Sequence, residues 1–390
     1  MIEGRNIVCI ASNWAADPTS KHHIMRLVAE RNEIVWVNYH GSRRPRASAA
    51  DAGAIVGKLR QVIEGPRRVA ERITVVTPLV APLPGSRVVA ALNKRLLVRQ
   101  IKRVIRDLPP RPVQVWSFAP DVDFLCGSFD EEFFVYYCVD EFSEFEGYDR
   151  DAILSAEARL AAKADLVVVT SQALCEAKQR LNPRVVLVTH GVDYEHFAKA
   201  RRGEVVIPEE IAKLPRPILG FWGLIEGWVD VDLIAAMARA RPHWSIVLIG
   251  RFTADVSALE ELANVHLLGR RPYEQLPAYA RGFDAGLIPF RVNELTRAVN
   301  PIKLREYLSA GLPVVSTPMP EVERYGPHVS IASDAAEFVA ACERMIAENS
   351  PGKILERQTA MQRETWQSKV EEVCSLIRPP RPVSLHRSPS

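Results

Sequence analysis

Short apolar runs separated by helical patterns recur along the first half of the chain. Each run is continuous, whereas a strand with one face in water would alternate apolar and polar residues. Continuous runs are typical of a parallel sheet covered on both faces, and helical patterns at 20–31, 150–163 and 171–181 provide such covers. The predicted strands are Ile7–Ala11, Ile34–Asn38, Ile73–Val76, Val113–Ser117, Phe133–Val139, Leu166–Thr170 and Val185–Thr189.

The alternation stops between residues 199 and 217, where charge and proline dominate, and it then starts again. We interpret this interval as a linker between two domains of the same architecture. The second half has predicted strands at Ile218–Trp222, Ser245–Ile249, Val265–Leu268, Ala285–Ile288, Pro313–Ser316 and Val329–Ile331, and predicted helices at 229–240, 259–263, 273–281, 301–310, 334–347 and 354–377.

These patterns predict two doubly wound, Rossmann-like α/β domains that face a central cleft. A chain of 390 residues is long enough for two such cores. The predicted boundaries are 1–199 for the first domain, 200–216 for the linker, 217–353 for the second domain, 354–378 for a C-terminal helix that packs back on the first domain, and 379–390 for a disordered tail.

The segment at residues 297–317 reads as a loop, a helix and a buried strand. Asn300 is a good N-cap and Pro301 a good first helical residue. Lys303 and Glu306 share a face near this helix N-terminus, where backbone N–H groups favour a phosphate. The pair fits a cation for a diphosphate and a carboxylate for sugar hydroxyls. In an isolated helix, a solvated ion pair is the plainer interpretation.

Charge is unevenly distributed along the chain. Residues 1–111 hold 20 Lys and Arg against 8 Asp and Glu, whereas residues 112–200 hold 7 against 16. In the basic part, a helix over residues 95–108 has a cationic side and an apolar side. Such a helix fits an anionic membrane surface, or it is a surface helix whose apolar side lies in the core. Nucleic-acid binding is disfavoured because no aromatic residues alternate with the basic ones.

Composition adds mainly exclusions. The six cysteines are scattered without a CxxC pair, which favours a reducing cytoplasm and argues against a disulfide framework or a structural zinc site. We expect no signal peptide, and no apolar run approaches the roughly 20 residues of a membrane span. The glycine fingerprint of a conventional NAD site and the P-loop of an ATPase are both missing.

The order and spacing of five segments in the second half resemble the donor domain of two-domain, GT-B glycosyltransferases, especially bacterial enzymes of family 4 and family 1-like enzymes. These segments are Gly220–Gly227, Val247–Arg251, Val265–Ala280, Asp284–Phe290 and Arg297–Thr317. In the first half, Asp17–Met25, Val135–Phe145 and Thr189–Asp193 look, more weakly, like bacterial polysaccharide glycosyltransferases. The resemblance implies a nucleotide-sugar donor in the C-terminal domain and an acceptor in the N-terminal domain.

The resemblance also implies roles for residues. Glu306 would bind the donor ribose, and Gly223 would let the chain approach the donor closely. The other implied donor-site residues are Arg251, Arg297 and Lys303 as cations, Asn300, Pro301 and Ile302 at the diphosphate, and Arg270, Arg271 and Tyr273 beside the base. Two features depart from the family pattern. Ala298 stands where family 4 enzymes have a first glutamate, and the loop at 224–228 lacks the usual cations.

The first half supplies candidates for acid–base chemistry and acceptor binding. Asp140 follows a predicted strand and is our first candidate for the general base, with Glu141 as runner-up. His190 ends another predicted strand and is a further candidate. Each has a structural alternative, as a loop cap for the carboxylates and as a hinge residue for the histidine. The acceptor-site candidates are Trp14, Lys21, His22 and His23, which are equally compatible with ordinary packing and helix-start roles.

The sequence therefore predicts a hexosyltransferase-like enzyme that moves a sugar from a nucleoside-diphosphate sugar to a glycan or lipid-linked acceptor in exopolysaccharide or cell-envelope synthesis. We expect no metal and no cofactor. Asp121 and Asp123 have the DxD spacing of a metal-binding motif, but they lie at a predicted helix start, where a capping role is the plainer interpretation. We also expect work in the cytoplasm, at the inner membrane face. Two alternatives remain: a nucleotide-sugar epimerase of the same fold, and a non-catalytic partner subunit.

Overall fold

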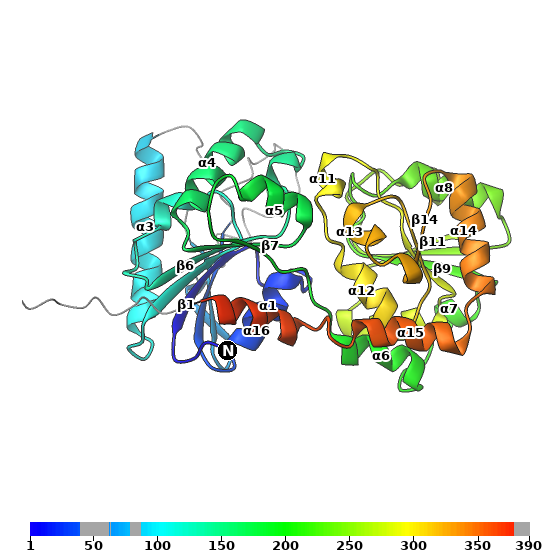
Figure 1. Cartoon of the computed structure of the whole chain (residues 1–390), viewed down its shortest axis with the longest axis horizontal. Helices are drawn as coiled ribbons and strands as arrows, with labels where there is room; N and C mark the ends of the chain where they lie inside the picture. The colour runs from blue at the N-terminus through cyan, green and yellow to red at the C-terminus, as the bar shows by residue number, and fades with distance from the viewer. Residues whose placement is uncertain (40–61, 63, 79–86, 378–390) are drawn as a thin grey trace, which may run out of the picture. The chain divides into compact units, whose positions relative to one another are not determined.

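The chain divides into two compact units, each with its own sheet (Figure 1). The computed structural model describes residues 1–39, 62, 64–78 and 87–377. Unit 1 comprises residues 1–169, 175–188 and the C-terminal part from 370, and unit 2 comprises residues 170–174 and 189–369. The predicted disordered tail at 379–390 lies outside the described residues.

Unit 1 contains an eight-stranded sheet, counted over the described residues, with the order β3-β4-β2-β1-β5-β6-β7-β8. Its strands are β1 (Asn6–Ala11), β2 (Glu33–Asn38), β3 (Arg67–Ala70), β4 (Ile73–Val76), β5 (Val113–Ser117), β6 (Phe133–Cys138), β7 (Leu166–Val169) and β8 (Val185–Leu187). Its helices are α1 (Ser20–Val28), α3 (Arg87–Arg106) and α4 (Arg150–Lys163), with single turns η1 (Asp123–Leu125) and η2 (Phe142–Glu144). Apart from the β3–β4 pair, the strands run parallel.

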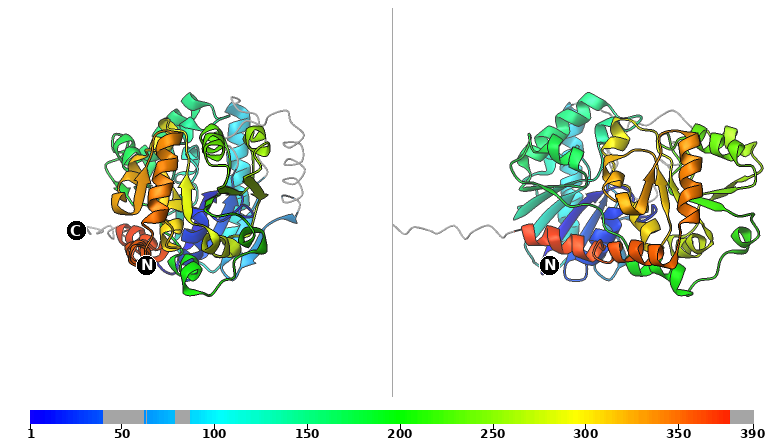
Figure 2. Two further views of the ribbon diagram at one scale, coloured as in Figure 1. Left: turned by 90° about the vertical axis from the view of Figure 1, so that its right-hand side faces the viewer. Right: turned by 45° about the vertical axis from the view of Figure 1, so that its right-hand side comes forward.

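Unit 2 contains a parallel sheet with the order β11-β10-β9-β12-β13-β14. Its strands are β9 (Ile218–Trp222), β10 (Ser245–Ile249), β11 (Val265–Gly269), β12 (Ala285–Ile288), β13 (Val314–Ser316) and β14 (Val329–Ile331). Its helices are α6 (Tyr194–Arg202), α7 (Glu209–Ala212), α8 (Val231–Ala240), α9 (Ser257–Glu260), α10 (Leu276–Gly282), α11 (Glu294–Arg297), α12 (Ile302–Ser309), α13 (Pro320–Glu323), α14 (Ala335–Ala347) and α15 (Pro351–Met361), with turns η3 (Tyr273–Gln275) and η4 (Gly326–His328). In Figure 2 (right), α14 stands beside the strands and α15 lies below them.

The prediction of two parallel-sheet α/β domains is confirmed. Both sheets reverse their strand order at one point, between β1 and β5 in unit 1 and between β9 and β12 in unit 2. Ligands of doubly wound sheets bind at such points, outside the carboxyl ends of the strands. The loops that follow β1, β9 and β12 are therefore the places where candidate residues matter.

The boundary between the units falls earlier than the charged interval for which we predict a linker. The chain passes into unit 2 at Thr189, and the interval 199–217 contains the end of α6 and all of α7. Within this interval, Ala200 and Ile211 are buried in the unit 2 core. The segment is polar because most of its other residues face solvent, which hid its helices from the pattern.

The single helix predicted over 354–377 is two helices, α15 and α16 (Trp366–Leu376), separately labelled in Figure 1. Between them, the backbone pairs with residue Val192, whose N–H donates to Glu364 O at 2.8 Å and whose carbonyl accepts from Trp366 N at 3.2 Å. Gly191 permits this approach, because a Cβ at that position would lie 2.6 Å from Trp366 N. Residues of α16 from Val370 onward belong to unit 1.

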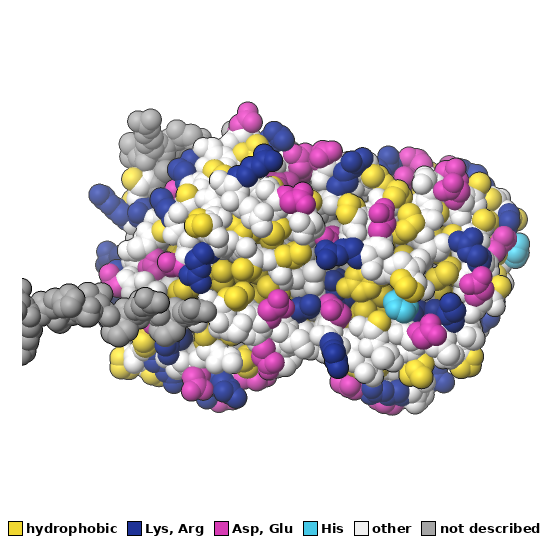
Figure 3. Space-filling model, in the orientation of Figure 1, with side chains coloured by type: hydrophobic (Ala, Val, Ile, Leu, Met, Phe, Trp, Pro, Cys, Tyr) yellow, Lys and Arg dark blue, Asp and Glu magenta, His cyan; other side chains and the backbone are white. Residues whose placement is uncertain are grey.

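Helix α3 has its apolar side in the core. Leu97, Ile101 and Val104 are buried, which matches the plainer of our two interpretations of this helix. Most of the exposed residues are basic, namely Lys94, Arg95, Arg99, Lys102, Arg103 and Arg106, and Ala91 and Leu92 near the start of the helix are exposed as well. In Figure 3, dark-blue side chains lie along the end of unit 1 that α3 occupies in Figure 1. The apolar residues Leu97, Ile101 and Val104 are therefore not available for insertion into a membrane.

Candidate active site

Helix α12 of unit 2 begins beside the switch point of the sheet, and its start differs from the prediction. Its N-cap is Pro301, and no side chain within the described residues caps it. The predicted N-cap Asn300 turns its side chain elsewhere. Its Nδ2 donates to Thr170 O at 2.9 Å and to Glu321 Oε2 at 3.0 Å, and its Oδ1 accepts from Arg305 Nη1 at 2.5 Å. The buried Arg305 thus takes Asn300 away from the capping role.

Lys303 lies against the loop that follows β9. Gly223 in that loop has φ +138°, a conformation that side chains rarely adopt, and a Cβ there would lie 3.3 Å from Lys303 Cε. The Lys303 ammonium sits 5.2 Å from the ring centroid of Phe221 and 4.9 Å from that of Phe290. The first turn of α12 and the end of β9 therefore form one surface that carries a cation.

Glu306 lies one turn further along α12 and is 9% exposed. Its Oε2 accepts a hydrogen bond of 2.7 Å from Trp222 Nε1. Burial raises the pKa of the Glu306 carboxyl above its usual value, while the Trp222 N–H and the charge of Lys303 act in the opposite direction. Glu306 and Lys303 are thus not a solvated ion pair, because the carboxylate is inside the protein.

Of the arginines predicted for the donor site, three have exposed side chains and the fourth is bound by neighbouring residues. The side chains of Arg251, Arg270 and Arg297 are exposed. Arg271 is committed to an ion pair of 2.9 Å with Glu210, and it also donates to the hydroxyl of Tyr279 at 2.8 Å. This is a structural role that competes with the predicted contact to the base.

Tyr273 is held by helix α6. Its ring stacks on His196 with centroids 4.7 Å apart, and its carbonyl lies 3.0 Å from His196 Nε2. The loop predicted to face the base is thereby fixed by His196, a residue that sequence reasoning missed.

Pro301 is buried and Ile302 half-buried at the start of α12.

In unit 1, Asp140 follows the last residues of β6 and is half-buried. Its backbone carbonyl accepts a hydrogen bond from Cys138 Sγ at 3.4 Å. Lys21, at the start of α1, interacts with the charge of Asp140. Burial lowers the pKa of Lys21, and the negative charge of Asp140 acts in the opposite direction. The structure thus brings together two predicted site residues from different elements.

Glu141 is engaged in a buried ion-pair network. Its Oε2 lies 3.0 Å from Lys178 Nζ, which also lies 2.8 Å from Glu157 Oε2. Tyr136 donates its hydroxyl hydrogen to Glu157 at 2.5 Å. Glu141 thus has structural partners inside unit 1, whereas the choice of Asp140 as the general base stays a prediction.

His22 has the structural place at a helix start that we gave as its alternative role. It is 1% exposed, its Nδ1 accepts from Thr19 N at 3.1 Å in a capping box, and its ring packs against Trp36 at 4.9 Å. Burial and the charge of Lys21 lower its pKa to about 3. His22 therefore cannot present a charged ring to an anionic acceptor.

The neighbours of His22 remain accessible. Trp14 and His23 are half-buried, and the guanidinium of Arg26 lies 5.5 Å from the ring centroid of Trp14.

His190 is a weak candidate for a base. It is 5% exposed in unit 2, and its Nδ1 is buried without a hydrogen-bond partner among the described residues. Burial and the nearby charge of Arg305 lower its pKa to about 3. Its ring meets Trp366 edge-on, with centroids 5.9 Å apart. These contacts favour the structural alternative.

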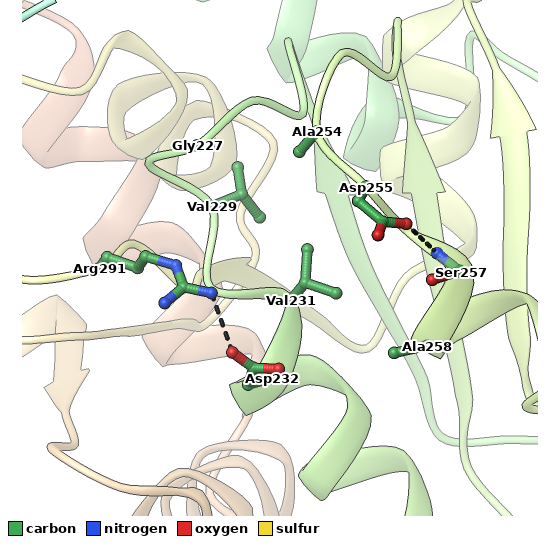
Figure 4. Close-up of a pocket in the computed structure, with 9 residues that line it drawn as sticks. All are labelled: Gly227, Val229, Val231, Asp232, Ala254, Asp255, Ser257, Ala258 and Arg291. Atoms are coloured by element: carbon green, nitrogen blue, oxygen red, sulfur yellow. Dashed lines mark hydrogen bonds and ion pairs between the residues drawn. The ribbon is translucent and has the colours of Figure 1, made fainter. Parts of the chain in front are cut away.

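A hollow of about 360 Å³ also opens in unit 2, beside the loop after β9 (Figure 4). Val229, Val231 and Ala254 line it, and a 2.9 Å ion pair between Arg291 and Asp232 lies at one side. None of the predicted donor-site residues lines this hollow.

Two features are absent from the described residues. No helix in this part of the chain combines the length and apolar character needed to cross a bilayer. The same residues hold no cluster of three or more His, Cys, Asp or Glu suited to a metal ion. Asp123, half of the DxD spacing, instead pairs with Arg159 at 3.2 Å and Lys163 at 3.1 Å.

Comparisons with known proteins agree with this architecture. Residues 216–348 match the family described as glycosyl transferases group 1. A Bacillus subtilis protein, TuaH, provisionally named a teichuronic acid biosynthesis glycosyltransferase, is 29% identical over 257 residues. That match covers 60% of this chain and 64% of TuaH, which is less than two thirds of the relative's own length.

Solved structures show the same fold at low sequence identity. Sucrose-phosphate synthase of Thermosynechococcus elongatus has a TM-score of 0.66 and 15% identity, with 95% of this chain and 98% of that chain covered. HepE of Anabaena, solved with UDP-glucose, has a TM-score of 0.65 and 14% identity, with 95% and 100% covered.

Proposed function

Because residues 216–348 form a glycosyltransferase group 1 domain, we propose that this chain transfers a sugar from a nucleoside-diphosphate sugar to a glycan or lipid-linked acceptor. The processes we assign to it are exopolysaccharide or cell-envelope synthesis. The name of TuaH supports this assignment, as does the UDP-glucose bound to HepE. The observation that carries the proposal is the pairing of Lys303 and the buried Glu306 beside Gly223, at the switch point of the unit 2 sheet.

We assign the donor to this surface by its chemistry. The charge of Lys303 and the partial positive charge at the start of α12 suit a diphosphate, both in the bound donor and as it leaves. The carboxylate of Glu306 accepts hydrogen bonds and suits the hydroxyls of ribose. The loop at 224–228 lacks the cations usual in the family. The exposed Arg251 and Arg297 would supply positive charge to the diphosphate in their place.

We assign the acceptor to unit 1. Asp140 takes the proton of the acceptor hydroxyl, and Lys21 balances the charge of its carboxylate. Half-buried Trp14 and His23 offer contacts for the acceptor sugar. In this scheme the protein's own cations and helix terminus stabilise the leaving group, without a metal or cofactor.

We further propose that the enzyme works at the inner face of the membrane, on the cytoplasmic side. The exposed basic residues of α3 support attraction to anionic lipid chiefly by charge, because Leu97, Ile101 and Val104 of this helix lie in the core.

A thermal-shift panel tests the donor assignment. Wild type and Glu306→Ala are compared with UDP-, GDP-, ADP- and TDP-sugars, and Glu323→Ala, an exposed glutamate of the same unit, is the matched control. We expect one nucleotide class to raise the Tm of wild type and of the control by roughly 3–8 °C at a hundredfold excess over Kd, and not that of Glu306→Ala.

Other outcomes of the panel point to the alternatives. A folded wild type that no nucleotide sugar stabilises contradicts the proposal. Binding followed by sugar release without acceptor would favour an epimerase, and binding without turnover on any acceptor would favour a non-catalytic subunit. Buried Ala298, in place of the first family glutamate, is the feature that motivates the last reading.

A further inference from the structure

Trp222 has an unusual partner for a core residue. It is the last residue of β9 and is 4% exposed, and its indole N–H donates to the carboxylate of Glu306 at 2.7 Å. A buried indole N–H needs an acceptor, and a neutral carbonyl or hydroxyl would serve at lower cost than a buried charge. The choice of a carboxylate therefore calls for a reason beyond packing.

The indole ring is fixed from several sides. Phe197 of α6 stacks on it with centroids 5.8 Å apart and planes 4° from parallel, and Tyr307 meets it edge-on at 4.3 Å. The backbone N–H of Trp222 also donates to the hydroxyl of Tyr307 at 3.2 Å. Because the donor cannot move, the hydrogen bond fixes the position of the Glu306 carboxylate.

The two oxygens of Glu306 have different surroundings. Oε2 is taken by Trp222, whereas Oε1 makes no hydrogen bond within the part of the chain that the structure describes. Oε1 is also not among the buried atoms left without a partner, so it is the oxygen that reaches solvent. One carboxylate oxygen is thus held in place and the other is presented outward.

An ionised carboxylate oxygen accepts hydrogen bonds and repels phosphate, so the group that it recognises is a hydroxyl. The phosphate-seeking cation, Lys303, stands three residues before it on the same helix face. This spacing separates a hydroxyl-binding point from a phosphate-binding point, as a nucleoside diphosphate requires. The outward oxygen has lone pairs for two hydroxyls on neighbouring carbons.

We propose that Trp222 is a positioning residue that fixes Glu306 to read the ribose 2′-hydroxyl, so that the site selects ribonucleoside over 2′-deoxyribonucleoside diphosphates. This inference rests on the proposed function, because it takes the nucleotide site at α12 as given. A 2′-deoxy ligand leaves a carboxylate oxygen desolvated and short of one partner, and unpaired buried polar groups reject such analogues strongly. A carboxylate free to rotate would adapt to the remaining 3′-hydroxyl and discriminate less.

Calorimetric titration of UDP, GDP and ADP against their 2′-deoxy forms tests the proposal. We expect wild type to bind the ribonucleotide of its preferred base roughly 10- to 100-fold more tightly than the 2′-deoxy form. Trp222→Phe keeps an aromatic ring and removes the N–H. It should reduce this ratio to about 3-fold or less, with the affinity for the 2′-deoxy form within about 2-fold of wild type.

Two further proteins make the result specific. Trp244→Phe replaces another buried tryptophan of unit 2 and should keep the full ratio. Glu306→Gln combined with Trp222→Phe should behave like Glu306→Gln alone, because both changes act on one interaction. If Trp222→Phe does not fold, benzothienylalanine at position 222 keeps the ring shape without an N–H and takes its place.

The outcomes separate the inference from the proposed function. A Trp222→Phe protein that keeps the wild-type ratio, or that loses affinity for both forms equally, overturns the role of Trp222 and leaves the nucleotide site standing. A folded wild type that binds none of the six nucleotides overturns both.

Discussion

Glu306 shows how far a motif in the sequence reaches. Spacing and the family resemblance predict its helix, the face that it shares with Lys303, and its expected ligand. Its partner does not, because Trp222 is 84 residues away in the chain and reads as the end of an apolar strand. The same holds for Arg305, whose hydrogen bond to Asn300 overrides that residue's preference for the N-cap.

Replacing Glu306 with Gln removes a buried charge. Since burial raises the pKa of this carboxyl, the folded state binds its proton more readily than the unfolded chain, and the ionised form costs stability at neutral pH. This cost in stability is present above the pKa that Glu306 has in the folded protein. It disappears as the pH falls below 4.5, the ordinary pKa of a glutamate carboxyl. We expect Glu306→Gln to raise the Tm at pH 8 by roughly 1–3 °C while nucleotide binding is weakened.

Thermal unfolding from pH 4 to pH 8 measures this effect. The difference in Tm should shrink toward pH 4, and the exposed Glu323→Gln should show none of it. A Glu306→Gln protein that is less stable than wild type at pH 8 would contradict the assigned cost.

Helix α12 is held at its C-terminal end by side chains from two other helices. Arg357 of α15 donates to Gly311 O at 3.2 and 3.0 Å, and Arg201 of α6 donates to Ala310 O at 3.1 Å. These cations sit at the negative end of the helix dipole. Sequence reasoning found α12 through its local signals, but it missed this support because Arg201 comes from the segment taken as a linker and Arg357 from the C-terminal helix that we predict to pack on the first domain.

The buried Arg357 provides a test of that support. Burial lowers its pKa to about 10, so it stays charged at neutral pH. Arg357→Met should lower the free energy of unfolding by about 2 kcal/mol, since three charge-assisted hydrogen bonds are lost, two to Gly311 O and one to Asn349. Urea unfolding measures the change, and the exposed Arg363→Met should stay within about 0.5 kcal/mol of wild type. Equal effects of the two substitutions would remove Arg357 from this role.

Helix α3 carries the membrane proposal by charge. Reversing Arg95, Arg99 and Arg103 to Glu leaves the buried side of the helix intact. We expect wild type to sediment with vesicles that contain phosphatidylglycerol and not with pure phosphatidylcholine. The triple variant should bind at least roughly 100-fold more weakly, at about 1 kcal/mol per residue.

High salt should release the wild type. A triple variant with Lys213, Arg239 and Arg363 reversed to Glu changes the net charge equally on the other unit and should bind as wild type does. Vesicle binding that survives the α3 changes would place the contact elsewhere.

Across the whole molecule, buried histidines couple stability to pH. His22 in unit 1 and His190 in unit 2 both have their pKa lowered to about 3, chiefly by burial. The unfolded chain therefore binds more protons than the folded one between about pH 3 and the ordinary value of 6.5. Stability is fully present above that value and falls as the pH drops below it, by up to about 1.4 kcal/mol per pH unit for each histidine.

Urea unfolding at pH 7, 6, 5 and 4.5 measures this slope. His190→Gln should make the slope shallower by up to one proton, and the exposed His243→Gln should leave it unchanged. An unchanged slope in His190→Gln would show that its ring is not buried neutral.

The pattern of apolar runs predicted the two sheets, because most strands of both sheets are continuous runs of apolar residues. It did not foretell β3, whose residues Arg67–Ala70 are mostly exposed and pair only along one edge with β4. It also placed the passage between the units at the most polar segment. The actual passage at residue 189 is the short segment Thr189–Gly191 directly after an apolar strand, which is too brief to read as a linker from composition.

The assignment of residues from Val370 to unit 1 has a consequence for the order in which the protein is completed on the ribosome. Val370, Val373 and Ile377 are buried, so they belong to the interior of the unit that the first half of the chain begins. Domains made early in synthesis ordinarily finish folding before later ones emerge. Here the earlier unit lacks this piece until residue 370 and the residues after it have been made, and unit 2 can close first. Nascent chains stalled before residue 370 should therefore expose unit 1 to proteases while unit 2 already resists them.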